Sequence, residues 1–246
     1  MPRKESASDP GIAALLGVIV LCLSPWPVTA QALATSAGAG PPSATSERAP
    51  IVVGDFSSGL AADGAPLGWQ LAKHAGSPDI RIFRESSLAA LEMRSQRASF
   101  GVQRALSIDL ASHPYLSWMW LVDELPRGGD FRSSETDDQA AQLYVVFPGM
   151  RVIAYFWEST PPAGTVGEAM GIPLFAKVKV LVLRSGPNEA RHWLLESRDL
   201  LADYRALFGE ELGDKRVLGL RLWTNSQHTA SSSACAFADI AFKGIE

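Results

Sequence analysis

The sequence predicts an all-β fold, namely a jelly-roll-like β-sandwich of about ten to twelve strands with one short amphipathic helix near residues 199–208. Two observations support this fold class. Apolar residues recur with a period of two in short runs, and Gly, Pro and acidic residues separate those runs. Only one segment has helical spacing, so strands do not alternate with helices, and this favours a β-sandwich over an α/β fold.

The run 217–224 has the clearest strand pattern. Leu218, Leu220 and Leu222 point to one face, while Val217, Gly219, Arg221 and Trp223 point to the other. A strand that is apolar on one side and polar on the other is typical of a sheet that covers a core with one face. In chain order, the other predicted strands are 51–56, 80–83, 88–95, 100–110, 115–126, 136–149, 151–158, 178–183, 192–197 and 234–242.

The predicted helix lies between the predicted strands at 192–197 and 217–224. Asp199 is a candidate N-cap, and Gly209 is a candidate C-terminal stop. The apolar residues that share one face of this helix are Leu200, Leu201, Tyr204, Leu207 and Phe208. We therefore expect a helix that packs against the sandwich or its rim.

The N-terminal residues resemble a targeting segment. An apolar run at 11–23 is followed by two prolines, and small residues at Val28 and Ala30 precede a candidate cleavage site. We therefore predict a signal peptide at 1–30, a disordered linker at 31–50 and a single β-sandwich domain at 51–246. An uncleaved N-terminal anchor is the alternative. After cleavage we expect no membrane span and a periplasmic or secreted location.

Charge and motif content exclude several classes of partner. The net charge is -4, and the charges are interspersed without a basic run, so we expect no nucleic-acid partner. The four histidines are far apart, and neither zinc spacing nor a phosphate-binding glycine loop occurs, so we expect no metal and no cofactor. Cys235 is the single cysteine beyond residue 30; it cannot form an intramolecular disulfide in the mature chain and is expected to be buried.

The order of several motifs resembles a known family. These motifs include an Asp-Asp-x-Ala-Ala run at 137–141 and an Asp-Tyr-x-x-x-Phe-Gly helix ending at 203–209. In this order the mature chain is similar to the bacterial domain-of-unknown-function family 3047. The resemblance implies an exported, β-rich domain without an established activity. The family pattern carries Arg at the position of Gln142 and an acidic turn near 224–229, so this chain lacks charges that other members have.

The carboxylates give one functional hypothesis. Asp137 and Asp138 are adjacent, so on a strand they point to opposite faces and cannot form a catalytic dyad with each other. One of them could act with Glu158 in a glycan-processing enzyme, which needs two carboxyl groups about 5 to 9.5 Å apart. We favour the alternative that they anchor the entrance of a strand by accepting backbone N–H groups. The acidic residues of the loop at 123–138 are of a type that binds calcium. They lack the spacing of an EF-hand or of a calcium-binding repeat, so we favour a solvated loop.

The aromatic residues give a second hypothesis. Trp118 and Trp120 share a strand face, and Trp223 lies beside Arg221 with Asn225 on the same strand. Aromatic rings next to polar side chains bind the apolar faces of sugar rings. The candidate ligand-binding residues are Arg221, Trp223, Asp137, Asp138, Trp118, Trp120 and Asn225. No nucleophile motif occurs, so no catalytic residue is assigned.

These observations favour a non-catalytic, exported β-sandwich that binds a carbohydrate or a related envelope component. A carboxylate-dependent glycan-processing enzyme is the first alternative. A structural or protein-interaction domain that docks a partner through a sheet face or an edge strand is the second. The sequence identifies neither the ligand nor the oligomeric state.

Overall fold

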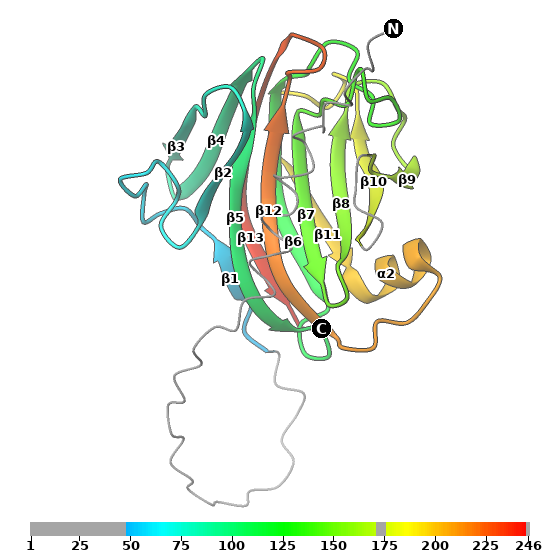
Figure 1. Ribbon diagram of the computed structural model, residues 1–246. Coiled ribbons are helices and arrows are strands. Elements are labelled where there is room, and N and C mark those ends of the chain that lie inside the picture. Colours follow the sequence, from blue (N-terminus) through cyan, green and yellow to red (C-terminus); the bar gives the residue numbers. More distant parts are fainter. Residues whose placement is uncertain (1–47, 171–175, 245–246) are drawn as a thin grey trace, which may run out of the picture.

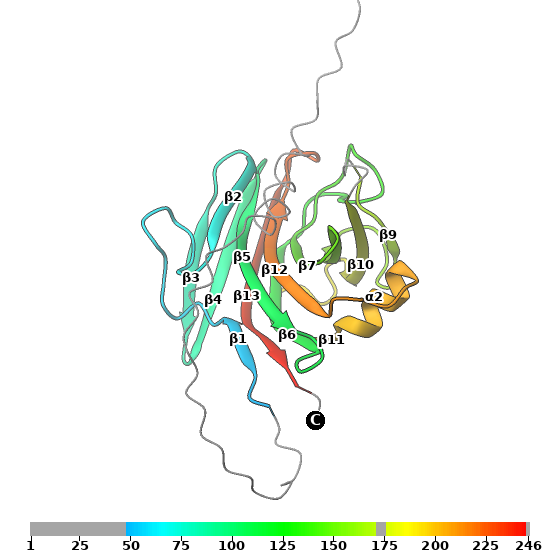
Figure 2. The same ribbon diagram turned by 60° about the horizontal axis from the view of Figure 1, so that its bottom comes forward.

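The computed structural model describes residues 48–170 and 176–244, and within them the chain is a β-sandwich of two sheets (Figures 1 and 2). The predicted signal peptide and all of the predicted linker except its last three residues lie outside these described residues. The strands are β1 (Ile51–Gly54), β2 (Gln70–Ala75), β3 (Ile80–Glu85), β4 (Leu88–Gln96), β5 (Ser99–Asp109), β6 (Tyr115–Glu124), β7 (Ala141–Phe147), β8 (Arg151–Glu158), β9 (Val166–Glu168), β10 (Lys177–Ser185), β11 (Leu194–Asp199), β12 (Arg216–Asn225) and β13 (Ser232–Lys243).

The sheet order confirms the predicted jelly-roll-like sandwich. One sheet has the order β11-β6-β13-β4-β3, and β1 pairs with the end of β13. The other has the order β2-β5-β12-β7-β8-β10-β9. The last two strands of the chain therefore lie inside the two sheets, β12 between β5 and β7 and β13 between β4 and β6. All pairings are antiparallel except that of β8 with β10.

Two strands were not predicted, β2 and β9. Both lie at sheet edges, and their side chains are half-buried or exposed along their whole length. An edge strand that packs weakly on either face has no clear alternation of apolar and polar residues. This explains why the sequence pattern did not reveal them.

The predicted helix is confirmed as α2 (Leu200–Phe208). The side chain of Asp199 accepts hydrogen bonds from the backbone N–H groups of Leu201 and Ala202, both at 3.0 Å. Gly209 ends the helix in the left-handed conformation at φ 72°. The Tyr204 ring packs on Phe147 with a centroid distance of 5.3 Å, which fixes the helix against the seven-stranded sheet.

An aromatic stack fills the core between the sheets. Trp118 and Trp120 come from β6, and Tyr155 and Trp157 from β8 in the opposite sheet; all four are fully buried. Ring centroids are 5.4 Å apart for Trp118 and Tyr155 and 5.6 Å apart for Trp120 and Trp157. Such pairs add to the free energy of apolar burial. These rings hold the two layers together.

Two of the four polar ends of the stack, those of Trp120 and Tyr155, are bonded to other side chains. The Trp120 indole N–H donates to Glu196 at 3.1 Å, and Arg184 donates to the same carboxylate at 2.7 Å. The Tyr155 hydroxyl donates to Asp203 at 2.6 Å, and burial is the main reason why the pKa of this hydroxyl lies well above its ordinary value. Cys235 is buried as predicted. In the described residues, no helix is long and apolar enough to span a bilayer.

The stack predicts a large loss of stability in Trp120→Ala. Removing a fully buried indole leaves a cavity, so the free energy of unfolding should fall by roughly 3–5 kcal/mol. Leu195→Ala is the control: this side chain is 63% exposed on β11, and its loss should change the free energy of unfolding by less than about 0.5 kcal/mol. Urea unfolding followed by circular dichroism measures both. Equal, small effects would show that the stack does not hold the sheets together.

Candidate functional site

The outer face of the seven-stranded sheet carries most of the predicted ligand-binding residues. Leu220 and Leu222 of β12 belong to the main core, so Arg221 and Trp223 point away from it. On either side of β12, Arg221 is paired with Gln103 of β5 and Tyr144 of β7. Side chains at paired positions share a face, so these residues form one row across three strands.

Arg221 lies against two aromatic rings in this row. Its guanidinium carbon is 3.6 Å from the centroid of the Trp223 ring and 5.8 Å from that of Tyr144. Burial lowers the pKa of Arg221 to about 10, which leaves the side chain protonated at neutral pH. The guanidinium therefore covers one face of the indole that we predicted as a sugar-stacking ring.

Gly101 makes room for the Trp223 indole. A Cβ at this position would lie 2.7 Å from Cε3 of Trp223 and 1.9 Å from the carbonyl oxygen of Leu222. The Trp223 indole N–H donates a hydrogen bond to the Ser99 hydroxyl, two residues before Gly101 on β5, at 3.0 Å. The position of the ring is therefore set by β5 and by Arg221 together.

A chain of hydrogen bonds continues from Tyr144. The Tyr144 hydroxyl donates to the Gln142 side chain, and Gln142 donates to Asn225 Oδ1 at 2.6 Å. The Asn225 amide then donates to the carbonyl oxygen of Asp137 at 2.6 Å. Asn225 thus ties the loop before β7 to the end of β12, and its polar atoms are used within the protein.

The two adjacent aspartates have different surroundings. Asp138 is fully buried, and its carboxylate accepts from the backbone N–H of Thr229 at 2.6 Å and from the Thr229 hydroxyl at 2.7 Å. It therefore anchors the turn between β12 and β13. The Asp137 carboxylate accepts from the Gln139 side chain at 2.9 Å, and burial raises the pKa of Asp137. The anchoring role that we favoured from the sequence fits Asp138 well.

Glu158 at the end of β8 also binds a loop. Its carboxylate accepts from the backbone N–H of Phe131 at 3.2 Å and from that of Ser159 at 3.3 Å. Burial, and to a smaller extent the charges of Asp137 and Asp130, raise the pKa of Glu158 to about 8. Within the described ranges, His, Cys, Asp and Glu side chains nowhere gather in threes in a way that could hold a metal ion.

Trp118 and Trp120 lie apart from this face. Both are fully buried in the core, so neither presents a ring to a ligand. Of the predicted ligand-binding residues, Arg221, Trp223, Asn225 and Asp137 come together on the outer face and its adjoining loop. Asp138 is bonded to the neighbouring turn. The ligand-binding role of these residues stays a prediction.

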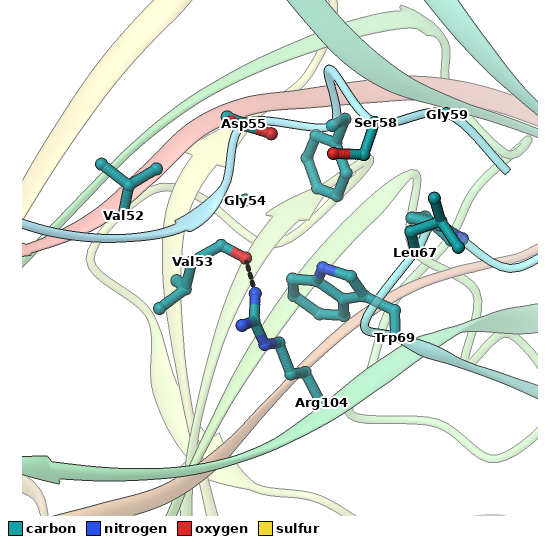
Figure 3. A pocket seen from close by; sticks show the side chains of 11 residues that line it. Val52, Val53, Gly54, Asp55, Ser58, Gly59, Leu67, Trp69 and Arg104 are labelled. Atoms are coloured by element: carbon teal, nitrogen blue, oxygen red, sulfur yellow. Dashed lines mark hydrogen bonds between the residues drawn. The ribbon is translucent and has the colours of Figure 1, made fainter.

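A pocket of about 260 Å³ lies elsewhere, between β1 and β5 (Figure 3). Trp69 and Arg104 lie on one side of it, and the side chains of Asp55 and Ser58 lie on the other (Figure 3). Arg104 Nη1 donates to the carbonyl oxygen of Val53 at 2.7 Å, which joins β5 of one sheet to β1 of the other. The complete lining is Val52, Val53, Gly54, Asp55, Phe56, Ser58, Gly59, Pro66, Leu67, Trp69 and Arg104.

The sequence interpretation missed this pocket. Its aromatic floor is formed by Trp69 and Phe56, whose ring centroids are 5.8 Å apart. These residues are 7% and 4% exposed, so only a small part of each ring reaches the pocket. Two signals were available: the charged Arg104 within the predicted strand 100–110, and a turn sequence at 56–59 with a tryptophan further along the chain at position 69. Neither shows that β1 and β5, far apart in the sequence, lie side by side.

The raised pKa of Glu158 predicts a pH-dependent stability. The folded protein holds this proton up to about pH 8, whereas the ordinary carboxyl pKa is 4.5, so the folded state binds more protons between these values. The free energy of unfolding should therefore fall as the pH rises from 4.5 to about 8. Glu158→Gln removes the titrating carboxyl group and should therefore remove this decline.

Urea unfolding at several pH values measures the effect. Glu135→Gln is the control, because Glu135 is an exposed carboxyl in the loop that Glu158 binds. Its free energy of unfolding should depend on pH as it does in the unmodified protein. Parallel pH profiles for Glu158→Gln and the unmodified protein would show that Glu158 titrates normally.

Comparison with known proteins gives a family and several distant alignments. The xyloglucanase domain of NopAA from Sinorhizobium fredii, solved in complex with cellobiose, is 14% identical with a TM-score of 0.46 and covers 75% of this chain and 96% of that one. The family 12 xyloglucanase from Bacillus licheniformis is 7% identical with a TM-score of 0.46, and the alignment covers 80% of this chain and 100% of that one. Endoglucanase 3 from Trichoderma harzianum is 12% identical with a TM-score of 0.43, and the alignment covers 82% of this chain and 100% of that one.

TM-scores below 0.5 carry no argument about function, which must be argued from the residues of this chain. No curated protein matches the sequence. One family model matches residues 68–241, which is most of the domain, and its description is "Protein of unknown function (DUF3047)". The chain therefore belongs to the DUF3047 family, as the sequence motifs indicated.

Proposed function

We propose that the protein is a non-catalytic module that binds a carbohydrate or a related envelope ligand in the pocket between β1 and β5. The observation that supports this proposal best is the composition of the pocket. An aromatic floor lies beside a guanidinium, a carboxylate and a hydroxyl. A sugar ring has an apolar face that packs on aromatic carbon and hydroxyl edges that need donors and acceptors.

Arg104 is the best-oriented polar group of the pocket. Its Nη1 is fixed by the Val53 carbonyl at 2.7 Å, so the guanidinium plane is held beside the Trp69 ring (Figure 3). A fixed donor loses little side-chain entropy when it binds a hydroxyl group. From the opposite side of the pocket, the Asp55 carboxylate can accept hydrogen bonds from a ligand, and the Ser58 hydroxyl can donate or accept them.

The size of the pocket supports a small ligand. Pockets for drug-sized molecules are about 300–1,000 Å³, and this one has a volume of about 260 Å³. It therefore suits one sugar ring, such as the end of a longer glycan, better than the middle of an extended chain. With one sugar ring in the pocket and the rest of the glycan in solvent, an exported protein would recognise a larger envelope polymer by its end.

Binding is favoured over catalysis by the positions of the carboxylates. Glycoside hydrolysis needs two carboxyl groups on either side of the scissile bond. Asp55 is the single carboxylate in the described lining of the pocket. Asp138 and Glu158 hold loops by accepting backbone N–H groups, and neither belongs to this lining.

A periplasmic or secreted location remains part of this proposal. It depends on the targeting features of residues 1–30, which are an apolar run and small residues before a candidate cleavage site. Such a location would give the protein access to glycans of the cell envelope or to glycans outside the cell.

Titration of the purified protein with a panel of saccharides and peptidoglycan fragments tests the proposal. Isothermal calorimetry should detect binding of at least one saccharide, and Asp55→Asn should weaken it about tenfold or more because one charged hydrogen bond is lost. Asp214→Asn, an exposed carboxylate paired with Arg216, is the control and should not change the affinity.

Two results would contradict the proposal. Release of shorter products from an oligosaccharide would show catalysis. A loss of binding in Arg221→Gln, with no change in Asp55→Asn, would place the ligand on the outer face of the seven-stranded sheet. Circular dichroism of each variant checks that it is folded.

A further inference from the structure

Exposed apolar side chains lie at opposite ends of the pocket (Figure 3). Val52 is 55% exposed and Leu67 is 54% exposed, and both line the pocket themselves. Leu60, which forms a bridge with Pro66 in the adjoining loop, is 38% exposed. Of the eight large apolar side chains that are exposed in the described residues, four lie between positions 51 and 67, so this segment is unusually apolar on its surface. We call Val52, Leu60 and Leu67 the apolar rim.

The backbone of the apolar rim is held in place. Val52 is paired with Ala241 in the six-stranded sheet. The Leu67 N–H donates to the carbonyl oxygen of Gly59 at 3.1 Å, and Leu60 forms a bridge with Pro66. The Ala61 N–H donates to the carbonyl oxygen of Ala65 at 2.8 Å, which closes the loop. The three apolar side chains are thus presented on an ordered backbone.

The apolar rim and the polar groups of the pocket belong to one continuous surface. Arg104, Asp55 and Ser58 line the same pocket as Val52 and Leu67 (Figure 3). A free sugar would use the polar groups and leave the apolar rim in water. A ligand with a polar ring and an apolar chain would use both, since burial of exposed apolar surface is favourable.

We propose that the pocket takes the sugar of an amphipathic glycoside, the chemistry of a glycolipid, and that the apolar chain of this ligand lies over Val52, Leu60 and Leu67. This inference rests on the proposed carbohydrate binding and names the class of carbohydrate. Each methylene group that the rim covers should raise the affinity about fourfold. An octyl chain therefore has a large effect even if the rim covers only part of it.

Paired glycosides test this inference. The probes are the methyl and octyl β-glycosides of glucose, galactose, mannose and N-acetylglucosamine, with each octyl compound kept below its micelle concentration. For at least one sugar, calorimetry should show the octyl glycoside binding at least about tenfold more tightly than the methyl glycoside. 1-Octanol, which has the chain but no sugar, should bind much more weakly than that octyl glycoside.

The rim variant Val52→Ser/Leu67→Ser should lower the affinity for the octyl glycoside more than the affinity for the methyl glycoside, so that the tenfold gain is lost. Leu195→Ser is the matched control, because Leu195 is exposed on β11 and does not line the pocket. Leu195→Ser should still bind the octyl glycoside at least about tenfold more tightly than the methyl glycoside. The free energy of unfolding of both variants, measured with urea, shows whether the rim variant remains folded.

The possible failures are distinguishable. Equal affinities for methyl and octyl glycosides would overturn the inference about the rim and leave the proposed carbohydrate binding intact. Absence of binding to all probes and to the saccharide panel would overturn both. Equal binding of every octyl compound, octanol included, would show a purely apolar surface. A dimer in sedimentation velocity that Val52→Ser/Leu67→Ser dissociates, without any octyl gain, would assign the rim to contact between copies of the chain.

Discussion

The burial of Trp118, Trp120, Tyr155 and Trp157 between the two sheets is the interaction on which the rest of the structure depends. These rings come from β6 and β8, which lie in opposite layers, and their contacts fix the distance between the layers. With Cys235 as a free, buried thiol, non-covalent packing must supply this connection in the described chain. The same burial removes the largest rings from the surface, so a ligand site must be built from other aromatic residues.

The two places that could contact a ligand differ in how their polar groups are used. On the outer face of the seven-stranded sheet, Arg221 covers the Trp223 ring, and the side chains of Tyr144, Gln142 and Asn225 bond one another. In the pocket, Arg104 has one hydrogen bond to the backbone, and Asp55 Oδ1 accepts one from the Ser57 N–H at 2.9 Å; the side chains of Asp55 and Ser58 lie on the opposite side of the pocket from Arg104 (Figure 3). A group that is already bonded gains less from a ligand than a group that faces a pocket. This difference favours the pocket.

The sequence predicted the fold well because alternation along a strand reports burial directly. The pattern of 217–224 correctly placed Leu220 and Leu222 in the core and Arg221 and Trp223 on the opposite face. It was wrong for Val217 and Leu218, because a register shift between Val217 and Gly219 puts Val217 in the main core and Leu218 against the other apolar cluster. The helix and both of its caps were also predicted, since capping depends on neighbouring residues alone. Alternation says less where both faces are apolar, so the sequence of β6 alone does not show that Trp118 and Trp120 lie in the core.

The pocket could not be predicted because it depends on pairing between distant segments. Val53 and Arg104 are joined only because β1 pairs with β13 in one sheet while β5 pairs with β12 in the other. Both partner strands come from the end of the chain, and a sequence pattern does not specify which strands become neighbours. For the same reason, the sequence did not show that the Asp138 carboxylate meets the turn at Thr229.

Nuclear magnetic resonance of the indole N–H groups tests the central claim most directly. During a saccharide titration, the Trp69 indole resonance should shift as the ligand fills the pocket, and the Trp223 resonance, whose N–H is bonded to Ser99, should stay in place. A shift of Trp223 with an unchanged Trp69 would contradict the account, because it would place the ligand on the outer face of the seven-stranded sheet.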